Sequence, residues 1–300
     1  MQETITGSGQ LKINGEPMNI SFTVPKGPCL PEALLPDTQR FANQVTDLAV
    51  ARVERAGHRI SCAKGCGACC RQMVPISPPE ARHLAALVEA MPAAQAGEVR
   101  ARFKSAREVV VASGLPPHGP ADGDQAAYRV FGISYFGLGV PCPFLVEESC
   151  SIHPDRPLVC REYLVTSPPA ACGALGAGQV KQIPVPSRVW AVFARSTSAD
   201  GGLEWMPLIE ALDYVAENPT PAPDRTGPQY VEALLKEKLS ERERTILEKG
   251  ISNLEFHYLG SAKILGGVGK GLAEAMVRTA ASFATESSLR VASTAKPSLS

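Results

Sequence analysis

The chain has 300 residues, and its 30 basic and 30 acidic side chains cancel to a formal charge of zero. This balance argues against a nucleic-acid-binding protein or a polybasic membrane module, because both carry an excess of basic residues. The length suits one large or two modest domains that bury a core without disulfides. Glycine and proline number 26 each and 44% of the residues are hydrophobic, so we expect a globular chain interrupted by many loops.

The first twenty residues show neither a basic start followed by an apolar stretch nor a small-residue cleavage site. No window of the sequence approaches the ~18 consecutive apolar residues that a membrane helix needs. We therefore expect a cytoplasmic protein without a membrane partner. In that reducing compartment, clustered cysteines are more often metal ligands or redox groups than structural disulfides.

The predicted elements begin with a hairpin and a helix. Apolar and polar residues alternate over residues 10–25 around Asn14-Gly15, a pair typical of a tight hairpin turn. From Asp37 to about Gly57, apolar residues recur at helical spacing, and the glycine is a natural helix end. This helix leads into a cysteine-rich segment.

Two further helices are predicted after the cysteine-rich segment. Ser77 and Glu80 have the spacing of a capping box, and the prolines between them are tolerated in a first helical turn, so a helix should begin here. A second helix should run from about 94 to 112. Two stretches crowded with turn residues, 114–124 and 165–178, are predicted to be loops.

The rest of the chain is predicted to be mostly helical. The predicted elements are a short strand over 180–185, a helix or strand over 187–196, and helices over 203–216, 228–249 and 271–283. The fold class is therefore mainly helical α+β. We divide the chain into an N-terminal hairpin and helix (1–57), a cysteine-cluster domain (58–178), a helical region (179–284) and a disordered Ser/Ala-rich tail (285–300).

Eight of the nine cysteines lie between residues 62 and 172. The first group is Cys62-x3-Cys66-x2-Cys69-Cys70, in which short gaps let successive thiolates wrap one ion and the intervening glycines permit tight turns. The other clustered cysteines lie in turn-rich sequence, and they are Cys142, Cys150, Cys160 and Cys172. Cys29 stands alone and is expected to be an ordinary buried thiol.

Eight thiolates are the number required by two four-coordinate sites, or by one four-cysteine iron-sulfur cluster and one mononuclear site. The vicinal pair Cys69-Cys70 bears on this choice, because neighbouring side chains chelate one tetrahedral ion poorly. We hypothesise that the pair serves different metals or includes a bridging ligand. The sequence leaves open whether Arg156 and Arg161 offset the thiolate charge, and whether His153 supports the site or ligates.

These motifs resemble the YkgJ-type cysteine-cluster family. The resemblance rests on CAKGCGACC at 62–70, PCPFL at 141–145 and CSIHPDRPLVCR at 150–161, which occur in the family's order. It covers about residues 58–175 and leaves out the N-terminal hairpin and the helices after residue 200. Family members often carry a further cysteine about a dozen residues after the last motif cysteine, which here would be Cys172.

The resemblance implies a domain that chelates a zinc ion, an iron ion or a [4Fe-4S] cluster. The candidate ligands are Cys62, Cys66, Cys69, Cys70, Cys142, Cys150, Cys160 and Cys172. A structural or regulatory metal centre is the first interpretation. Because the family includes flagellin lysine N-methylases, the alternative is an iron-sulfur or iron-dependent enzyme that modifies proteins, with S-adenosylmethionine implied by family analogy alone. A protein partner or protein substrate fits these roles, and the sequence identifies neither catalytic residues nor an oligomeric state.

Two enzyme patterns compete with this interpretation. The spacing of Cys62, Cys66 and Cys69 matches radical S-adenosylmethionine enzymes, but those enzymes usually have an aromatic residue where this chain has Ala68, and they alternate strands with helices. The glycine-rich stretch 267–271 resembles a nucleotide loop, yet no strand ending in an acidic residue precedes it and only 29 residues follow it. We therefore expect metal binding.

Overall fold

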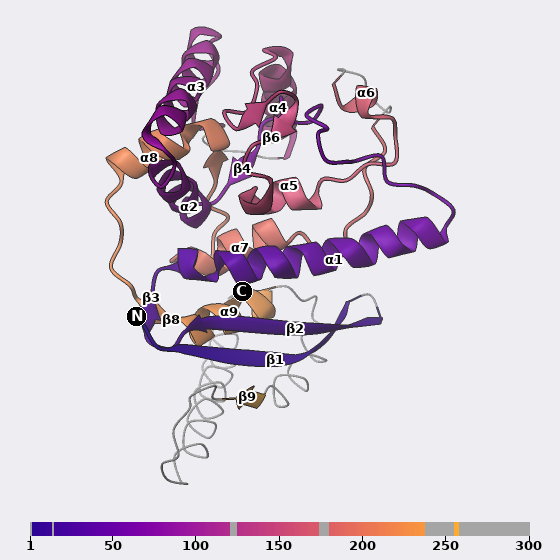
Figure 1. Ribbon diagram of the computed structural model, residues 1–300, viewed down its shortest axis with the longest axis vertical. Helices are drawn as coiled ribbons and strands as arrows, with labels where there is room; N and C mark the ends of the chain where they lie inside the picture. Colours follow the sequence, from indigo (N-terminus) through magenta and orange to yellow (C-terminus); the bar gives the residue numbers. More distant parts are fainter. Residues whose placement is uncertain (1, 14, 121–124, 174–179, 238–254, 258–300) are drawn as a thin grey trace, which may run out of the picture. The chain divides into compact units, whose positions relative to one another are not determined.

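The computed structural model describes residues 2–13, 15–120, 125–173, 180–237 and 255–257 (Figure 1). Helices and short antiparallel strand pairs make up this part of the chain, which confirms the mainly helical α+β class. Among the helices it describes, none is both long enough and apolar enough to cross a membrane. The division of the chain at residues 57, 178 and 284 stays a prediction.

The N-terminal hairpin is confirmed and is longer than its alternating pattern predicts. Strands β1 (Thr4–Ile13) and β2 (Glu16–Pro25) pair antiparallel, with Ile13 opposite Glu16 across a two-residue turn. Gly15 in that turn has φ 87°, which glycine adopts without strain. The short strand β9 (Glu255–His257) pairs with the other edge of β1.

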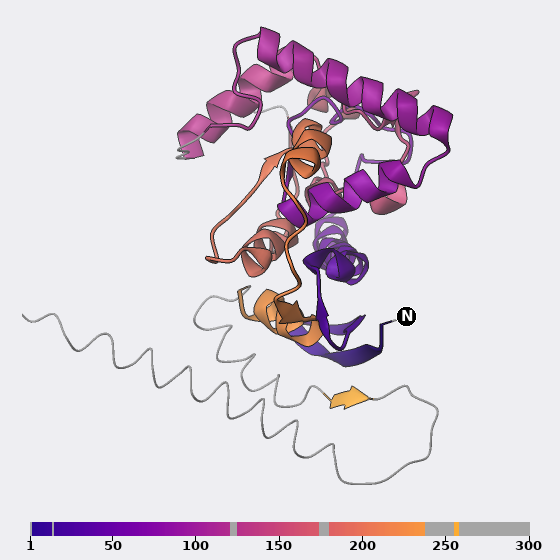
Figure 2. The same ribbon diagram turned by 90° about the vertical axis from the view of Figure 1, so that its left-hand side faces the viewer.

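Helix α1 (Leu35–Arg55), preceded by the 3-10 turn η1 (Pro31–Leu34), covers the hairpin. In Figures 1 and 2, α1 lies between the hairpin and the helices α2 and α3. Helices α7 (Val189–Thr197) and α9 (Gly227–Glu237) join the same core, and β3 (Pro28–Cys29) pairs with β8 (Arg225–Thr226) at its edge. We call residues 4–55, 189–197 and 225–237 the hairpin layer.

A second core forms around the helices α2 (Pro78–Glu89), α3 (Ala93–Ala112) and α8 (Ala211–Glu217). The predicted starts of α2 and α3 are confirmed. The helix predicted over 203–216 begins later, because the strands β4 (Pro75–Ile76) and β7 (Met206–Pro207) pair and hold this stretch extended before the 3-10 turn η3 (Leu208–Glu210). We call residues 58–173 and 206–217 the cavity layer.

Helix α4 (Gln125–Gly137) was not predicted from the sequence. Its buried aromatic residues Phe131 and Tyr135, four residues apart, pack against Val110 of α3 and Ile209. That spacing is typical of a helix, but the glycine- and proline-rich run just before it predicts a loop, and the helix was not inferred. The strand predicted over 180–185 reduces to a single bridge between Val165 and Gln182.

The cysteine motifs lie on short elements. Residues 58–74 form turns and irregular backbone before β4. The later motifs lie on the two-residue strands β5 (Leu145–Val146) and β6 (Ser149–Cys150), the 3-10 turn η2 (His153–Asp155), and the helices α5 (Leu158–Glu162) and α6 (Pro169–Cys172). The part of the 228–249 helix beyond Glu237, the 267–271 loop, the 271–283 helix and the 285–300 tail lie outside the described residues.

Candidate metal centre

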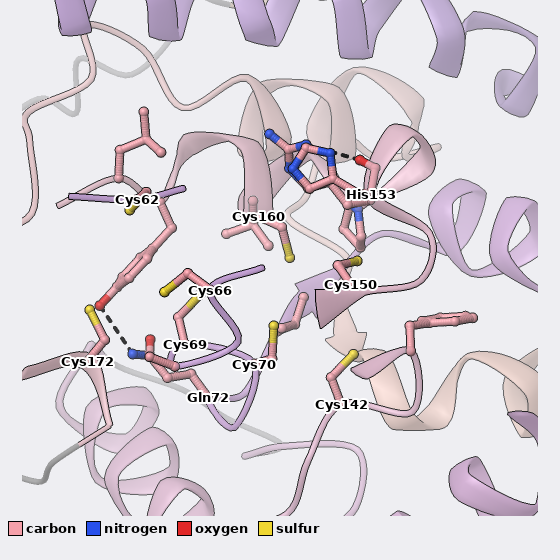
Figure 3. A pocket seen from close by; sticks show the side chains of 18 of the residues that line it. Cys62, Cys66, Cys69, Cys70, Gln72, Cys142, Cys150, His153, Cys160 and Cys172 are labelled. Carbon is pink, nitrogen blue, oxygen red and sulfur yellow. Dashed lines mark hydrogen bonds between the residues drawn. The ribbon is translucent and has the colours of Figure 1, made fainter. Parts of the chain in front are cut away.

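All eight clustered cysteines line one cavity of about 290 Å³ (Figure 3). Cys29 lies elsewhere, on β3, buried among the apolar side chains of the hairpin layer. All nine cysteines are free thiols. The structure therefore brings together the eight cysteines that the sequence groups as candidates and separates the one that the sequence sets apart.

The loop that carries the first motif depends on its two glycines. Gly65 has φ 85°, in the left-handed region that favours glycine. Gly67 lies against the turn between β5 and β6, where an added Cβ would be 2.7 Å from Leu145 Cδ1 and 2.8 Å from the carbonyl oxygen of Glu148. The motif therefore excludes a side chain at position 67, because the backbone must approach the hairpin that carries Cys150.

Hydrogen bonds fix the same loop at both ends. The backbone N–H of Ser61 donates to the carbonyl of Val165 at 2.9 Å, and the N–H of Cys142 donates to the carbonyl of Cys70 at 2.7 Å. Arg71 forms a bidentate ion pair with Glu148, at 3.0 and 2.6 Å. These contacts bring cysteines from distant parts of the sequence to one cavity without a long helix or strand.

Six of the thiols that line this cavity resist ionisation. Burial raises the pKa of Cys142 to about 12, and it also raises the pKa of Cys62, Cys150, Cys160 and Cys172. A hydrogen bond to Cys70, followed by burial, raises the pKa of Cys69 far above its usual range. A cation that binds several of these sulfurs must therefore displace their protons.

The donor set fits a thiophilic metal. Within the described ranges, no three Cys, His, Asp or Glu side chains are already close enough to hold one ion. The eight thiols nevertheless share one cavity, and thiolate sulfur is a preferred donor for zinc and for iron-sulfur clusters. Coordination therefore requires deprotonation of the thiols and rotation of their side chains toward a common centre.

Two of the three basic residues singled out by sequence line the cavity. His153 and Arg156 line it, and Nη1 of Arg156 lies 3.1 and 2.9 Å from the two ring nitrogens of His153 and donates to its carbonyl at 3.0 Å. The charge of Arg156 opposes the rise in the pKa of Cys150. Arg161 is buried, and it donates to the carbonyl of Arg156 at 3.0 Å. Arg161 therefore holds the loop in place, and its charge, like that of Arg156, also opposes the rise in the pKa of Cys150.

Two polar features of this site were missed by sequence reasoning. Glu80 is buried, and its carboxylate accepts hydrogen bonds from Ser77 and, at 2.9 Å, from the backbone N–H of Leu158, at the start of the helix that carries Cys160. Gln72 donates to the hydroxyl of Tyr163 at 3.2 Å in the cavity wall. The capping box signalled the first role of Glu80, but its contact with Leu158 spans 78 residues and has no local signal.

Comparison with known proteins agrees with the motifs. The family model CxxCxxCC, described as "Putative zinc- or iron-chelating domain", matches residues 61–180. No curated protein and no solved structure matches the chain. This match covers residues 61–180 of the 300 and agrees with the cysteine-cluster family that the sequence motifs resemble, which supports metal binding by this part of the chain.

Proposed function

We propose that this protein binds zinc or iron through the cysteines of the cavity, and that the metal holds the surrounding segments together. The observation that carries the proposal is the gathering of all eight clustered cysteines around one cavity, with Cys29 outside it. Sulfur donors on short loops are the usual ligands of structural zinc and of iron-sulfur clusters.

A structural role follows from the elements that carry the ligands. Cys150 lies on a two-residue strand, Cys160 on a five-residue helix and Cys172 on a four-residue helix. Such short elements form few internal hydrogen bonds, and isolated helices of this length are unstable in water. Metal coordination would cross-link these segments, so its binding free energy would contribute to folding.

Metal content tests the proposal. Protein purified without oxygen should contain zinc or iron by elemental analysis, and its visible spectrum separates colourless zinc protein from brown iron-sulfur protein. A variant with serine in place of Cys62, Cys66, Cys69 and Cys70 should lose most of this metal and unfold at a lower temperature. The matched control is Cys29→Ser, which should keep its metal. Full metal content in the quadruple variant would contradict the proposal.

An iron-dependent or iron-sulfur enzyme is the second candidate. The cavity extends past the thiols and is also lined by apolar side chains, among them Met73, Ile152 and Leu164. A catalytic metal keeps an open coordination position that faces such a space, whereas a structural metal is closed by protein ligands. By analogy with the flagellin lysine N-methylases of the family, the substrate would be a protein.

Cobalt substitution separates the two candidates. A closed site with four thiolates should give a visible Co²⁺ spectrum that is unchanged by added cyanide or azide. A spectrum that shifts with either anion would indicate an open position and favour the enzyme.

A further inference from the structure

The first cysteine motif is held at its two ends by different parts of the chain. At the Cys62 end, Ser61 donates from its backbone N–H to Val165 at 2.9 Å and from its hydroxyl to the carbonyl of Thr166 at 3.2 Å. From there the chain continues into α6, which ends with Cys172. These bonds place Cys62 on the side of the cavity that α6 supplies.

At the Cys70 end, the partners come from the 141–150 segment. The N–H of Cys142 donates to the carbonyl of Cys70 at 2.7 Å. The next residue, Arg71, pairs with Glu148 in the turn that leads to Cys150. Cys70 therefore lies on the side of the cavity supplied by the β5–β6 hairpin.

Figure 3 shows how the vicinal pair is shared. The side chain of Cys69 lies beside that of Cys66, on the side of Cys62 and Cys172, whereas the sulfur of Cys70 lies toward Cys142, Cys150 and Cys160. Neighbouring side chains close poorly on one tetrahedral ion. The hydrogen bond between Cys69 and Cys70 means that the two groups of thiols meet at the vicinal pair.

We infer that the eight cysteines form two separate four-thiolate centres, and that the vicinal pair contributes one thiolate to each. The first centre consists of Cys62, Cys66, Cys69 and Cys172. The second centre consists of Cys70, Cys142, Cys150 and Cys160. Each takes a thiophilic metal, and this inference rests on the proposed metal binding. Binding at either centre replaces the protons of the participating thiols by metal-sulfur bonds and releases those protons to solvent.

Zinc stoichiometry tests the division. The full chain, reduced and freed of metal without oxygen, is titrated with Zn²⁺ against a chromogenic chelator. We expect two equivalents for the wild type, one for Cys172→Ser and one for Cys142→Ser. The decisive comparison is between double variants. Cys62→Ser/Cys172→Ser removes two ligands from one centre and should still bind one equivalent, whereas Cys172→Ser/Cys142→Ser damages both centres and should bind none tightly.

Cadmium-113 NMR of the Cys69→Ser and Cys70→Ser variants tests whether the two vicinal cysteines bind different metal ions. The wild type loaded with Cd²⁺ should give two signals in the region of thiolate-bound cadmium. Cys69→Ser should abolish the signal that Cys172→Ser abolishes, and Cys70→Ser the one that Cys142→Ser abolishes. Loss of both signals in either vicinal variant would indicate a shared bridging thiolate and overturn the division.

Folding is monitored separately by circular dichroism, and Cys29→Ser is the control that should retain two equivalents and both signals. A wild type that binds one equivalent overturns the two-centre inference and leaves the proposed metal binding intact. A wild type that binds no zinc, iron or cadmium overturns both. Equal loss of both equivalents in every single variant contradicts the division into two centres.

Discussion

The hairpin layer and the cavity layer are stabilised by different means. The hairpin layer buries large apolar side chains such as Phe41, Phe193 and Leu234 on its helices, which share one core with a hairpin of two ten-residue strands. The cavity layer also has apolar clusters, but it buries Glu80, Arg161 and Glu162 alongside the thiols, whereas Asp37 is the buried charged side chain of the described hairpin layer. An apolar core tolerates substitutions that conserve its volume. A buried polar group, in contrast, lowers stability unless its hydrogen-bond or ion-pair partners are present.

Helix α5 joins the two layers. Arg161 donates to the side-chain oxygen of Asn43 on α1 at 3.3 Å, and Glu162 accepts a hydrogen bond from the N–H of Trp190, in the first turn of α7, at 2.9 Å. The same helix carries Cys160. A change at the thiols can therefore reach the hairpin layer through α5, whose Leu158 packs in the apolar core of that layer.

Phe41→Ala gives the largest effect that we expect from a single substitution in the hairpin layer. Phe41 is 2% exposed, and its ring centroid lies 5.8 Å from that of Phe22. Truncation of a buried phenylalanine leaves a cavity and costs about 4 kcal/mol in the free energy of unfolding. Chemical denaturation should show this loss, while the metal content per folded molecule stays unchanged.

The control for this substitution is Val130→Ala on α4, where the valine is 65% exposed and truncation should alter the free energy of unfolding by less than ~0.5 kcal/mol. A marked loss of metal from folded Phe41→Ala protein would contradict the separation of the two layers.

Glu80→Ala should affect both stability and metal binding in the cavity layer. The substitution leaves the buried N–H groups of Ser77 and Leu158 without an acceptor, which costs about 3 kcal/mol. Because Leu158 begins the helix that carries Cys160, the affinity for Zn²⁺ should fall as well. Denaturation and zinc competition measure the two effects.

Glu80→Gln is the matched comparison. Burial raises the pKa of Glu80, so the loss of its charge is tolerated, and Gln keeps one acceptor oxygen for either Ser77 or Leu158. It should lose less stability than Glu80→Ala, because one of the two buried N–H groups keeps its acceptor. If the two variants were equally destabilised, the hydrogen bonds to Ser77 and Leu158 would not be the cause.

The parts of the fold that could be predicted from the sequence are those with a local signal. The Asn-Gly turn, the apolar periodicity of α1 and the Ser77 capping box all predict their elements, because each pattern acts within a few residues. The motif spacing likewise identifies the eight cysteines that line the cavity.

The missed features depend on contacts between distant residues. Pairing of β4 with β7 delays the start of α8, and no pattern near Met206 signals it. The contact between Glu80 and Leu158 and the approach of Gly67 to Leu145 arise only after the chain folds. The assignment of individual thiols to one centre or the other is of the same kind, since it depends on which segment holds each end of the first motif.

The smallest effect that we expect is a pH dependence of the free energy of unfolding, and it comes from Glu210 in the cavity layer. Its buried carboxylate accepts hydrogen bonds from Nε of Arg107 at 3.1 and 3.3 Å, and it lies 3.2 Å from Nδ1 of His118. Burial raises the pKa of Glu210 above its ordinary value of 4.5, although Arg107 and His118 oppose this rise and Asp213 adds to it.

Because the native state binds this proton more tightly than the unfolded state does, the contribution of Glu210 to stability is complete below pH 4.5 and is lost as the pH rises through its native pKa. Glu210→Gln removes that titration, so the free energy of unfolding of the wild type relative to Glu210→Gln should fall as the pH rises from 4 to 7. The comparison is made in a His118→Asn background, which removes the neighbouring imidazole from both proteins. A relative stability that rises over this range would mean that Arg107 outweighs burial, and the cavity layer would then hold this carboxylate as a stabilising ion pair.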